Sequence, residues 1–79
     1  TEGLNIFQVR AHKSLVGKPL IHSGIREETQ CSVIAVKTGE AMEINPDPRQ
    51  PIPPDALLIL IGTTEGERRF ADRYPEDHG

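Results

Sequence analysis

Hydrophobic and polar positions alternate at the start of the chain. Phe7, Val9 and Ala11 fall on one side of an extended backbone, and the polar residues between them fall on the other. A period of two is typical of a half-buried strand. The pattern therefore predicts a strand over residues 5–11.

The spacing of the apolar residues becomes roughly helical between positions 15 and 25. Pro19 is tolerated only near a helix start, because its missing N–H group costs little there. We expect a helix over about residues 19–23, which Gly24 ends unless it serves a close backbone approach. Residues 25–30 predict one further short turn.

Two β-rich segments follow, with a glycine between them. Residues 31–37 form a β-branched run that is apolar on both faces and suits a central strand. Gly39 supplies the positive φ of a tight hairpin, so we expect residues 38–40 to turn. Residues 41–44 are then the returning strand, with side chains alternating between its faces.

Prolines dominate the next segment. Residues 45–54 contain five of the seven prolines, which predicts a stiff, extended loop across one end of the sheet. Residues 56–61 are apolar at every position and predict a buried central strand. Gly62 ends that strand.

The last segment has the signals of a helix. Thr64 and Glu67 have the spacing of a capping box, in which each side chain bonds a free N–H group of the first turn. Phe70 and Tyr74 lie four positions apart and share one face. Pro75 ends the helix, and the tail after it is expected to fray. The predicted order is β-α-β-β-β-α, which is an α+β domain.

The composition limits what this chain can be. A single domain of 79 residues has marginal stability alone, and one cysteine forbids an internal disulfide framework. We therefore expect a homodimer to add stability. The net charge of −3 and the dispersed basic residues argue against a nucleic-acid partner. A lone cysteine fits a cytosolic protein.

The longest uncharged apolar run is that of residues 56–61, far short of the roughly 20 residues of a membrane span. No charged segment followed by an apolar one marks a signal peptide at the N-terminus. Because the chain starts at Thr1 rather than at methionine, we expect one domain excised from a longer protein.

The sequence contains no recognisable catalytic motif. Ser14 and Ser23 lack both the glycines of a nucleophile elbow and an identifiable histidine–carboxylate partner. Gly17-Lys18 lacks the upstream glycine and the following hydroxyl residue of a P-loop. Cys31 has no basic neighbour to activate it and is interpreted as an inert buried thiol. The sequence therefore predicts that the protein is not an enzyme.

Carboxylates are the remaining candidates for binding chemistry. Glu27, Glu28, Glu40 and Glu43 could supply the oxygen ligands that divalent cations prefer. No loop has the dense, alternating carboxylates of a calcium site. A solvated acidic surface is therefore the preferred interpretation.

The order of several short sequence words is more specific than any word alone. They are Ser-Leu-Val-Gly-Lys-Pro-Leu at 14–20, Gly-Ile-Arg-Glu at 24–27, Ser-Val-Ile-Ala-Val at 32–36, Ile-Asn-Pro-Asp-Pro at 44–48 and Asp-Ala-Leu-Leu-Ile-Leu-Ile-Gly at 55–62. In this order they resemble the C-terminal domain of regulators of potassium conductance, also called the TrkA-C or RCK_C domain. The resemblance extends over about residues 5–74 and implies a small α+β fold with a mostly antiparallel sheet.

Two positions depart from the family pattern. Thr29-Gln30 stands where threonine–glycine or a similar glycine pair is usual, and Pro54-Asp55 stands where glycine–aspartate is usual. Proline stiffens the second turn, a change that need not alter function. The missing glycine at Gln30 bears on the shape of its turn and on ligand contacts near it.

The resemblance implies a cytoplasmic regulatory module of a potassium or other cation channel or transporter. Such modules pair as homodimers and act on the membrane-embedded portion of their parent. Some bind a small-molecule effector such as a cyclic dinucleotide between two copies, others bind a divalent cation, and many have no known ligand.

The resemblance also implies where a ligand would bind. The segments that line the cleft between two copies carry Ile25, Arg26, Val33, Asn45 and Pro46. An isoleucine would offer an apolar surface to a base, and a guanidinium would grip a phosphate with paired donors.

Other interpretations stay open for the same residues. Ile25 can be a core residue, Arg26 the surface partner of a neighbouring glutamate, and Pro46 a turn residue. The domain can also be a purely structural assembly module, or serve a carrier of another solute, because a fold does not fix a function.

Overall fold

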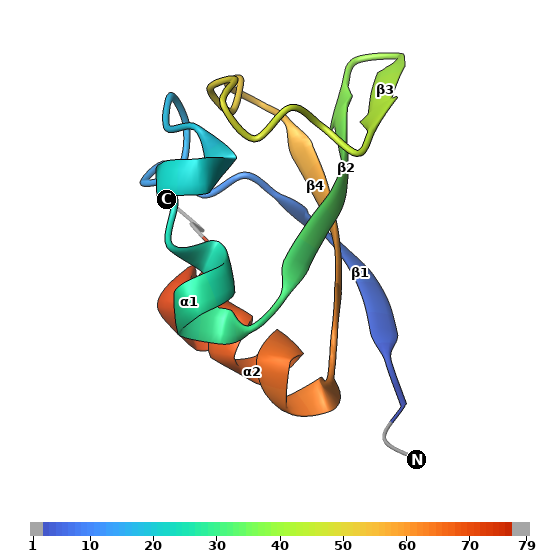
Figure 1. Cartoon of the computed structure of the whole chain (residues 1–79), viewed down its shortest axis with the longest axis vertical. Helices are drawn as coiled ribbons and strands as arrows, with labels where there is room; N and C mark the ends of the chain where they lie inside the picture. Colours follow the sequence, from blue (N-terminus) through green and yellow to red (C-terminus); the bar gives the residue numbers. More distant parts are fainter. Residues whose placement is uncertain (1–2, 77–79) are drawn as a thin grey trace.

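The computed structural model describes residues 3–76, whose elements are labelled in Figure 1. In chain order they are β1 (Asn5–Arg10), the 3-10 helix η1 (Leu20–His22), α1 (Ile25–Thr29), β2 (Ser32–Thr38), β3 (Ala41–Ile44), β4 (Leu57–Gly62) and α2 (Thr64–Arg73). The predicted order of elements is confirmed, except that two short helices, η1 and α1, stand where one helix was predicted. No helix in this part of the chain is long and apolar enough to cross a membrane. The fraying predicted for the tail lies, from residue 77 onward, outside the described residues.

The strands of the described chain form one antiparallel sheet in the order β1-β4-β2-β3. The two inner strands, β4 and β2, are the ones whose apolar runs predicted a central position. A bulge between Val33 and Ala35 interrupts the register of β2 with β4. The predicted α+β class and antiparallel sheet are confirmed.

The helices pack on one face of this sheet (Figure 1). Leu58 and Leu60 of β4 are completely buried on that face. Phe7 of β1 meets Phe70 of α2 edge to face, with ring centres 5.8 Å apart. Alternate residues of the strands point to the opposite face, where Ile6 is 66% exposed. The core therefore lies between the helices and one side of the sheet.

The segment after β1 contains two short helices rather than one helix and a turn. Gly24 separates η1 from α1 with a φ of +79°, a left-handed conformation that suits glycine. Of the two roles predicted for Gly24, ending the helix or allowing a close backbone approach, the first is the one observed. α1 occupies most of the turn predicted over residues 25–30.

The predicted capping box of α2 is wrong. The N-cap is Thr63, whose hydroxyl accepts the N–H of Gly66 at 3.0 Å. Thr64 and Glu67 instead accept hydrogen bonds from the side-chain amide of Asn5, at 3.2 and 3.1 Å. The hydrogen bonds from Asn5 thus replace the predicted capping-box bonds within the first turn of α2. They tie β1 to the start of α2.

Candidate functional site

A hollow of about 500 Å³ brings together all five residues that the family resemblance indicates: Ile25, Arg26, Val33, Asn45 and Pro46. η1 and α1 form one side of it, the first half of β2 forms another, and the loop leaving β3 closes the remaining side. Figure 1 shows α1 leading directly into β2, which fixes two of these sides relative to each other. Residues 20 positions apart in the sequence therefore meet at one surface.

The side made by η1 and α1 is set by a hydrogen-bonded turn. The Ser23 hydroxyl donates to the carbonyl of Leu20 at 2.8 Å and accepts the N–H of Ile25 at 3.3 Å. A Cβ atom at Gly24 would approach a carboxylate oxygen of Glu28 to 3.1 Å, so glycine suits this turn sterically as well. These contacts start α1 at Ile25 and leave the next residue at the border of the hollow.

The other end of α1 is held from inside the domain. Thr29 is completely buried, and its hydroxyl donates to the carbonyl of Ile25 at 2.6 Å. The same hydroxyl accepts the N–H of Cys31 at 3.1 Å. Gln30, between them, has a φ of +62°, in the region that favours glycine. The turn therefore keeps the shape that the family's usual glycine would adopt.

The loop after β3 closes the hollow through two backbone hydrogen bonds. Asn45 has a φ of +56°, and its N–H donates to the carbonyl of Ile34 at 2.9 Å. The N–H of Ile21 donates to the carbonyl of Pro48 at 2.9 Å, which links η1 to this loop. Prolines restrict the backbone between these bonds, so the three sides of the hollow form one preorganised unit.

The side chains differ in how far a ligand can reach them. Ile25 is only 3% exposed and belongs to the hydrophobic core, so it supports the hollow from beneath. Ile21 also borders the hollow and is 57% exposed, which makes it the more accessible apolar surface. The sequence pattern did not single out Ile21, because a helical spacing of apolar residues does not reveal which of them the core leaves uncovered.

Arg26 is the cationic group of this hollow. Its side chain is exposed, and its guanidinium makes no hydrogen bond or ion pair within residues 3–76. The pair with a neighbouring glutamate that the sequence suggested is therefore absent from this part of the chain. Glu27 borders the same hollow without neutralising the guanidinium through a direct contact. An unpaired guanidinium of this kind has all five donors available to an anion.

The four glutamates considered as metal ligands lie in different places. Glu28 accepts a hydrogen bond from Nε of Arg73 at 3.1 Å, which joins α1 to α2. Glu27 lies at the hollow, whereas Glu40 and Glu43 belong to the β2–β3 hairpin. Nowhere in residues 3–76 do three His, Cys, Asp or Glu side chains group closely enough to hold a metal ion.

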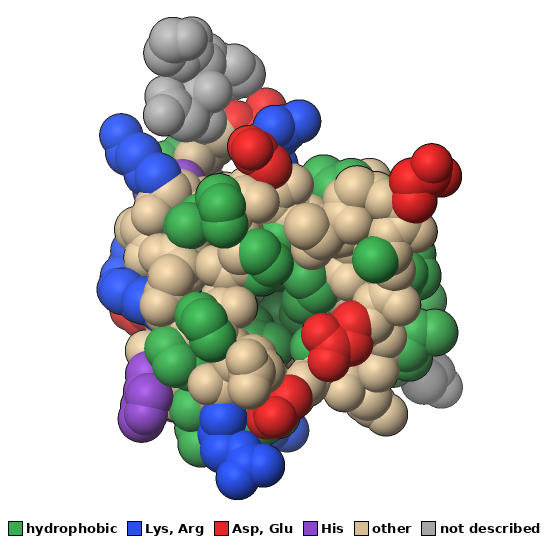
Figure 2. All heavy atoms as spheres, turned by 90° about the horizontal axis from the view of Figure 1, so that it is seen from above, with side chains coloured by type: hydrophobic (Ala, Val, Ile, Leu, Met, Phe, Trp, Pro, Cys, Tyr) green, Lys and Arg blue, Asp and Glu red, His purple; other side chains and the backbone are tan. Residues whose placement is uncertain are grey.

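A smaller hollow of about 320 Å³ lies between the proline segment and the β2–β3 hairpin. Figure 2 views this end of the domain and shows hydrophobic side chains around a hollow, with acidic side chains beside it. Val36 and Ile52 are buried at its base, and Glu43 and Asp47 border it. Pro46 borders both this hollow and the larger one, so the proline segment separates the two.

Comparison with known proteins supplies the context for this geometry. The model of the TrkA-C domain family matches residues 5–74. No curated protein matches the sequence. Among solved structures, the chain is similar to the RCK domain of GsuK, with 32% identity and a TM-score of 0.83; the match covers 90% of this chain and 16% of that one. Another structure shows the GsuK channel bound to NAD.

The chain is also similar to the RCK C domain of the potassium transport protein KtrA in complex with cyclic diadenosine monophosphate. The identity is 27% and the TM-score 0.82, and the match covers 89% of this chain and 82% of that one. The RCK_C domain dimer of S. agalactiae BusR, in complex with the same dinucleotide, is 14% identical with a TM-score of 0.76 over 90% of each chain. BusR is also known in complex with its promotor DNA. At that identity the likeness to BusR shows the fold alone.

Proposed function

Because the chain belongs to the TrkA-C domain family, and is therefore a regulatory domain, we propose that it regulates a potassium or other cation channel or transporter. The chain spans about a sixth of the GsuK chain, so the parent would contain much more than this domain. In this proposal the domain lies on the cytoplasmic side and works as a homodimer. The observation that carries the proposal is the single hollow that gathers the five indicated residues around an unpaired arginine.

The ligand that suits this site is a cyclic dinucleotide. A homodimer with two-fold symmetry would place two copies of the hollow, and therefore two Arg26 side chains, around one axis. A cyclic dinucleotide of one repeated nucleotide has the same two-fold symmetry, with two phosphates and two bases. Each guanidinium would pair with one phosphate, and each exposed Ile21 would contact one base. The KtrA relative, which was solved with such a ligand, supports this choice.

Regulation would follow from a population shift. A ligand held between two copies stabilises the arrangement of the dimer in which both hollows contact it. The membrane-embedded portion of the parent would respond to that arrangement. A ligand with equal affinity for both arrangements of the dimer would not shift their populations. The ligand therefore has to make contacts with both copies that only one arrangement allows.

Titration calorimetry with cyclic diadenosine monophosphate tests the proposal. We expect one ligand per two chains, and we expect Arg26→Ala to lower the affinity at least tenfold, since a charge-assisted hydrogen bond contributes about 1.5–3 kcal/mol. Arg69→Ala is the matched control, because Arg69 is an exposed arginine of α2 outside the hollow. The control should bind like the unmodified domain.

A folded dimer that binds no dinucleotide would favour the second candidate, a purely structural assembly module. The exposure of Ile21 at the rim favours this candidate too, because a second chain could cover it without a ligand. Under that model Ile21→Ser should weaken the dimer in light scattering, whereas Arg26→Ala should not. A carrier of another solute is a third possible parent, and the transmembrane sequence of the parent would identify it. The acidic net charge remains the reason to expect no nucleic acid at this domain.

A further inference from the structure

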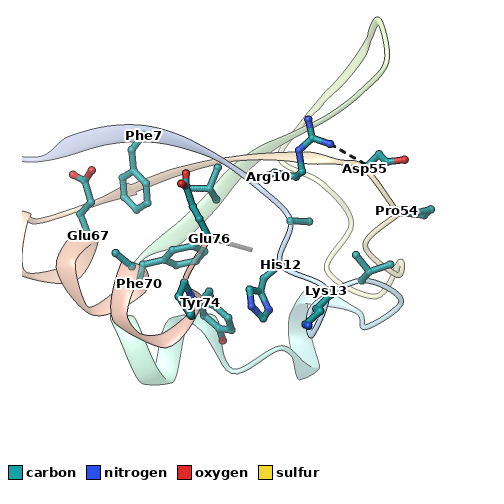
Figure 3. A pocket seen from close by; sticks show the side chains of 15 residues that line it. Phe7, Arg10, His12, Lys13, Pro54, Asp55, Glu67, Phe70, Tyr74 and Glu76 are labelled. Atoms are coloured by element: carbon teal, nitrogen blue, oxygen red, sulfur yellow. Dashed lines mark ion pairs between the residues drawn. The ribbon is translucent and has the colours of Figure 1, made fainter. Parts of the chain in front are cut away.

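A third hollow is larger than the two described above and shares no lining residue with them. It has a volume of about 650 Å³ and lies between β1 and the second half of α2 (Figure 3). Phe7 and Val9 of β1 and Phe70 and Tyr74 of α2 give it an apolar floor. Phe7 and Val9 are only partly buried, so apolar surface on the helix side of β1 remains uncovered.

The strand beside this groove has a free edge. β1 is the outermost strand of the sheet, and it pairs with β4 alone. The N–H of Ala11 donates to the carbonyl of Ala56, so the odd-numbered residues of β1 direct their backbone groups toward β4. By the same alternation, Ile6, Gln8 and Arg10 direct theirs outward. Within residues 3–76, no strand other than β4 pairs with β1, so these outward backbone groups have no strand partner.

This edge has few of the features by which proteins protect exposed strands. β1 is six residues long and contains neither proline nor a bulge. Ile6 is 66% exposed and Leu4, just before the strand, is 65% exposed. Arg10 is the one charged residue of the strand, and it lies 3.7 Å from Asp55 in an exposed ion pair. The opposite edge, β3, has only four residues and lies beside a smaller hollow.

Charged residues border the groove unevenly: Glu67 lies at one end, Glu76 lies in the middle, and the other end has Arg10, Lys13 and Asp55 (Figure 3). Glu67 borders it near the start of β1, where its Oε1 accepts a hydrogen bond from the side chain of Asn5 at 3.1 Å. That contact holds the carboxylate beside the start of β1, and Figure 3 shows Glu67 at one end of the groove. The net charge of −3 adds a general attraction for basic partners.

We propose that this groove and the free edge of β1 bind an extended peptide segment of another protein, which adds to the sheet as a fifth strand antiparallel to β1. Its backbone pairs with Ile6, Gln8 and Arg10, as in other cases of strand addition. Side chains opposite Val9 and Phe7 enter the groove and are apolar. The side chain opposite Asn5 is basic and pairs with Glu67. From its N-terminal end, the sequence of the bound segment is therefore apolar-x-apolar-x-basic, where x is any residue. This site is separate from the proposed dinucleotide site.

The probe is the capped peptide acetyl-Thr-Val-Thr-Val-Thr-Lys-amide, titrated into the ¹⁵N-labelled 79-residue chain. Its central Thr lies opposite Gln8 and its Lys opposite Asn5. We expect the amide signals of Ile6, Gln8 and Arg10 to shift and their hydrogen exchange to slow. Replacing Lys by Glu in the peptide should weaken binding about threefold to fivefold, as expected of a partly exposed ion pair. Arg26→Ala should leave peptide binding unchanged.

N-methylation of the peptide separates strand addition from contact with the apolar groove alone. The N–H of the central Thr points toward β1, so a methyl group there should abolish binding. The N–H of the Val that follows it points away, so methylation there should leave binding unchanged. Equal binding of both methylated peptides would overturn the proposal, as would signal shifts confined to residues outside β1 and α2. These peptides need no change in the protein, so its folding does not limit the test.

Discussion

Thr29→Val removes one buried hydroxyl and keeps the shape of the side chain. The Thr29 hydroxyl accepts the N–H of Cys31, and both residues are completely inaccessible to solvent. Valine leaves that N–H without an acceptor, which costs about 1–3 kcal/mol for a buried group. The added methyl group regains up to about 0.8 kcal/mol of apolar burial. The net expectation is a loss of about 1 kcal/mol in the free energy of unfolding, within a range of roughly 0.2–2.2 kcal/mol.

Urea denaturation and thermal unfolding measure this loss. For a domain of this size, 1 kcal/mol corresponds to about 4–8 °C in Tm, so a decrease of roughly 4–8 °C is expected. Protein concentration must be equal across variants, because a dimer's apparent stability depends on it. Thr29→Ser is the control: it retains the hydroxyl and loses one methyl group, which costs about 1 kcal/mol.

The amide exchange of Cys31 gives a second, local measurement. It should accelerate strongly in Thr29→Val and little in Thr29→Ser, because only valine removes the acceptor. A Thr29→Val domain as stable as the unmodified one, with an unchanged exchange rate at Cys31, would refute the reasoning. The hydroxyl would then be only a space-filling group at the end of α1.

Three further predictions concern other buried or strained positions. Gln30→Gly should stabilise the domain by about 0.5–1 kcal/mol in urea denaturation, because glycine adopts a φ of +62° without steric cost; a loss of stability would contradict this. Gly62→Ala should destabilise it by about 1–3 kcal/mol, since the new Cβ would lie 2.6 Å from Sγ of Cys31. Cys31→Ala should recover part of that loss, and strictly additive effects in a double-mutant cycle would disprove the clash. Burial raises the pKa of Tyr74 above its usual value near 10, against the opposing charge of Arg73. The unfolded chain therefore loses this proton first, and stability should fall as the pH rises past about 10. Tyr74 is the sole tyrosine, so its ultraviolet titration reports the pKa directly, and a midpoint unchanged by unfolding in urea would exclude the shift.

Strands and turns were predictable because their signals are local. The alternation in β1, the apolar runs of β2 and β4, and the glycine of the hairpin each depend on a few neighbouring residues. The N-cap of α2 was not predictable in the same way. Thr63 and Thr64 are adjacent and chemically identical, and the choice between them involves the Asn5 side chain, about 60 positions away in sequence. Local spacing cannot reveal a contact of that kind.

The candidate site was likewise predictable from the sequence only in part. The family resemblance indicates five positions, and the fold gathers them, because Arg26 and Ile25 follow a turn while Asn45 and Pro46 follow a strand paired with β2. What the sequence could not indicate was accessibility. Ile25 is buried and Ile21 is exposed, although both belong to the same apolar pattern. Their difference arises from tertiary packing, since Ile25 belongs to the core that α1 and the sheet share.

The shape of the hollow depends on backbone strain that glycine would relieve. Gln30 ends α1 and Asn45 ends β3, and both adopt left-handed conformations that cost a residue with a side chain about 1 kcal/mol or more. Asparagine tolerates this conformation better, because its short side chain can bond locally, whereas glutamine has no such advantage. Hydrogen bonds of the neighbouring Thr29 hydroxyl and of the Asn45 N–H hold the two turns in place. A Gln30→Gly domain that is more stable but binds the dinucleotide less tightly would show that the stiff turn positions α1 for the ligand. Unchanged affinity would assign that positioning to the buried Thr29 hydroxyl instead.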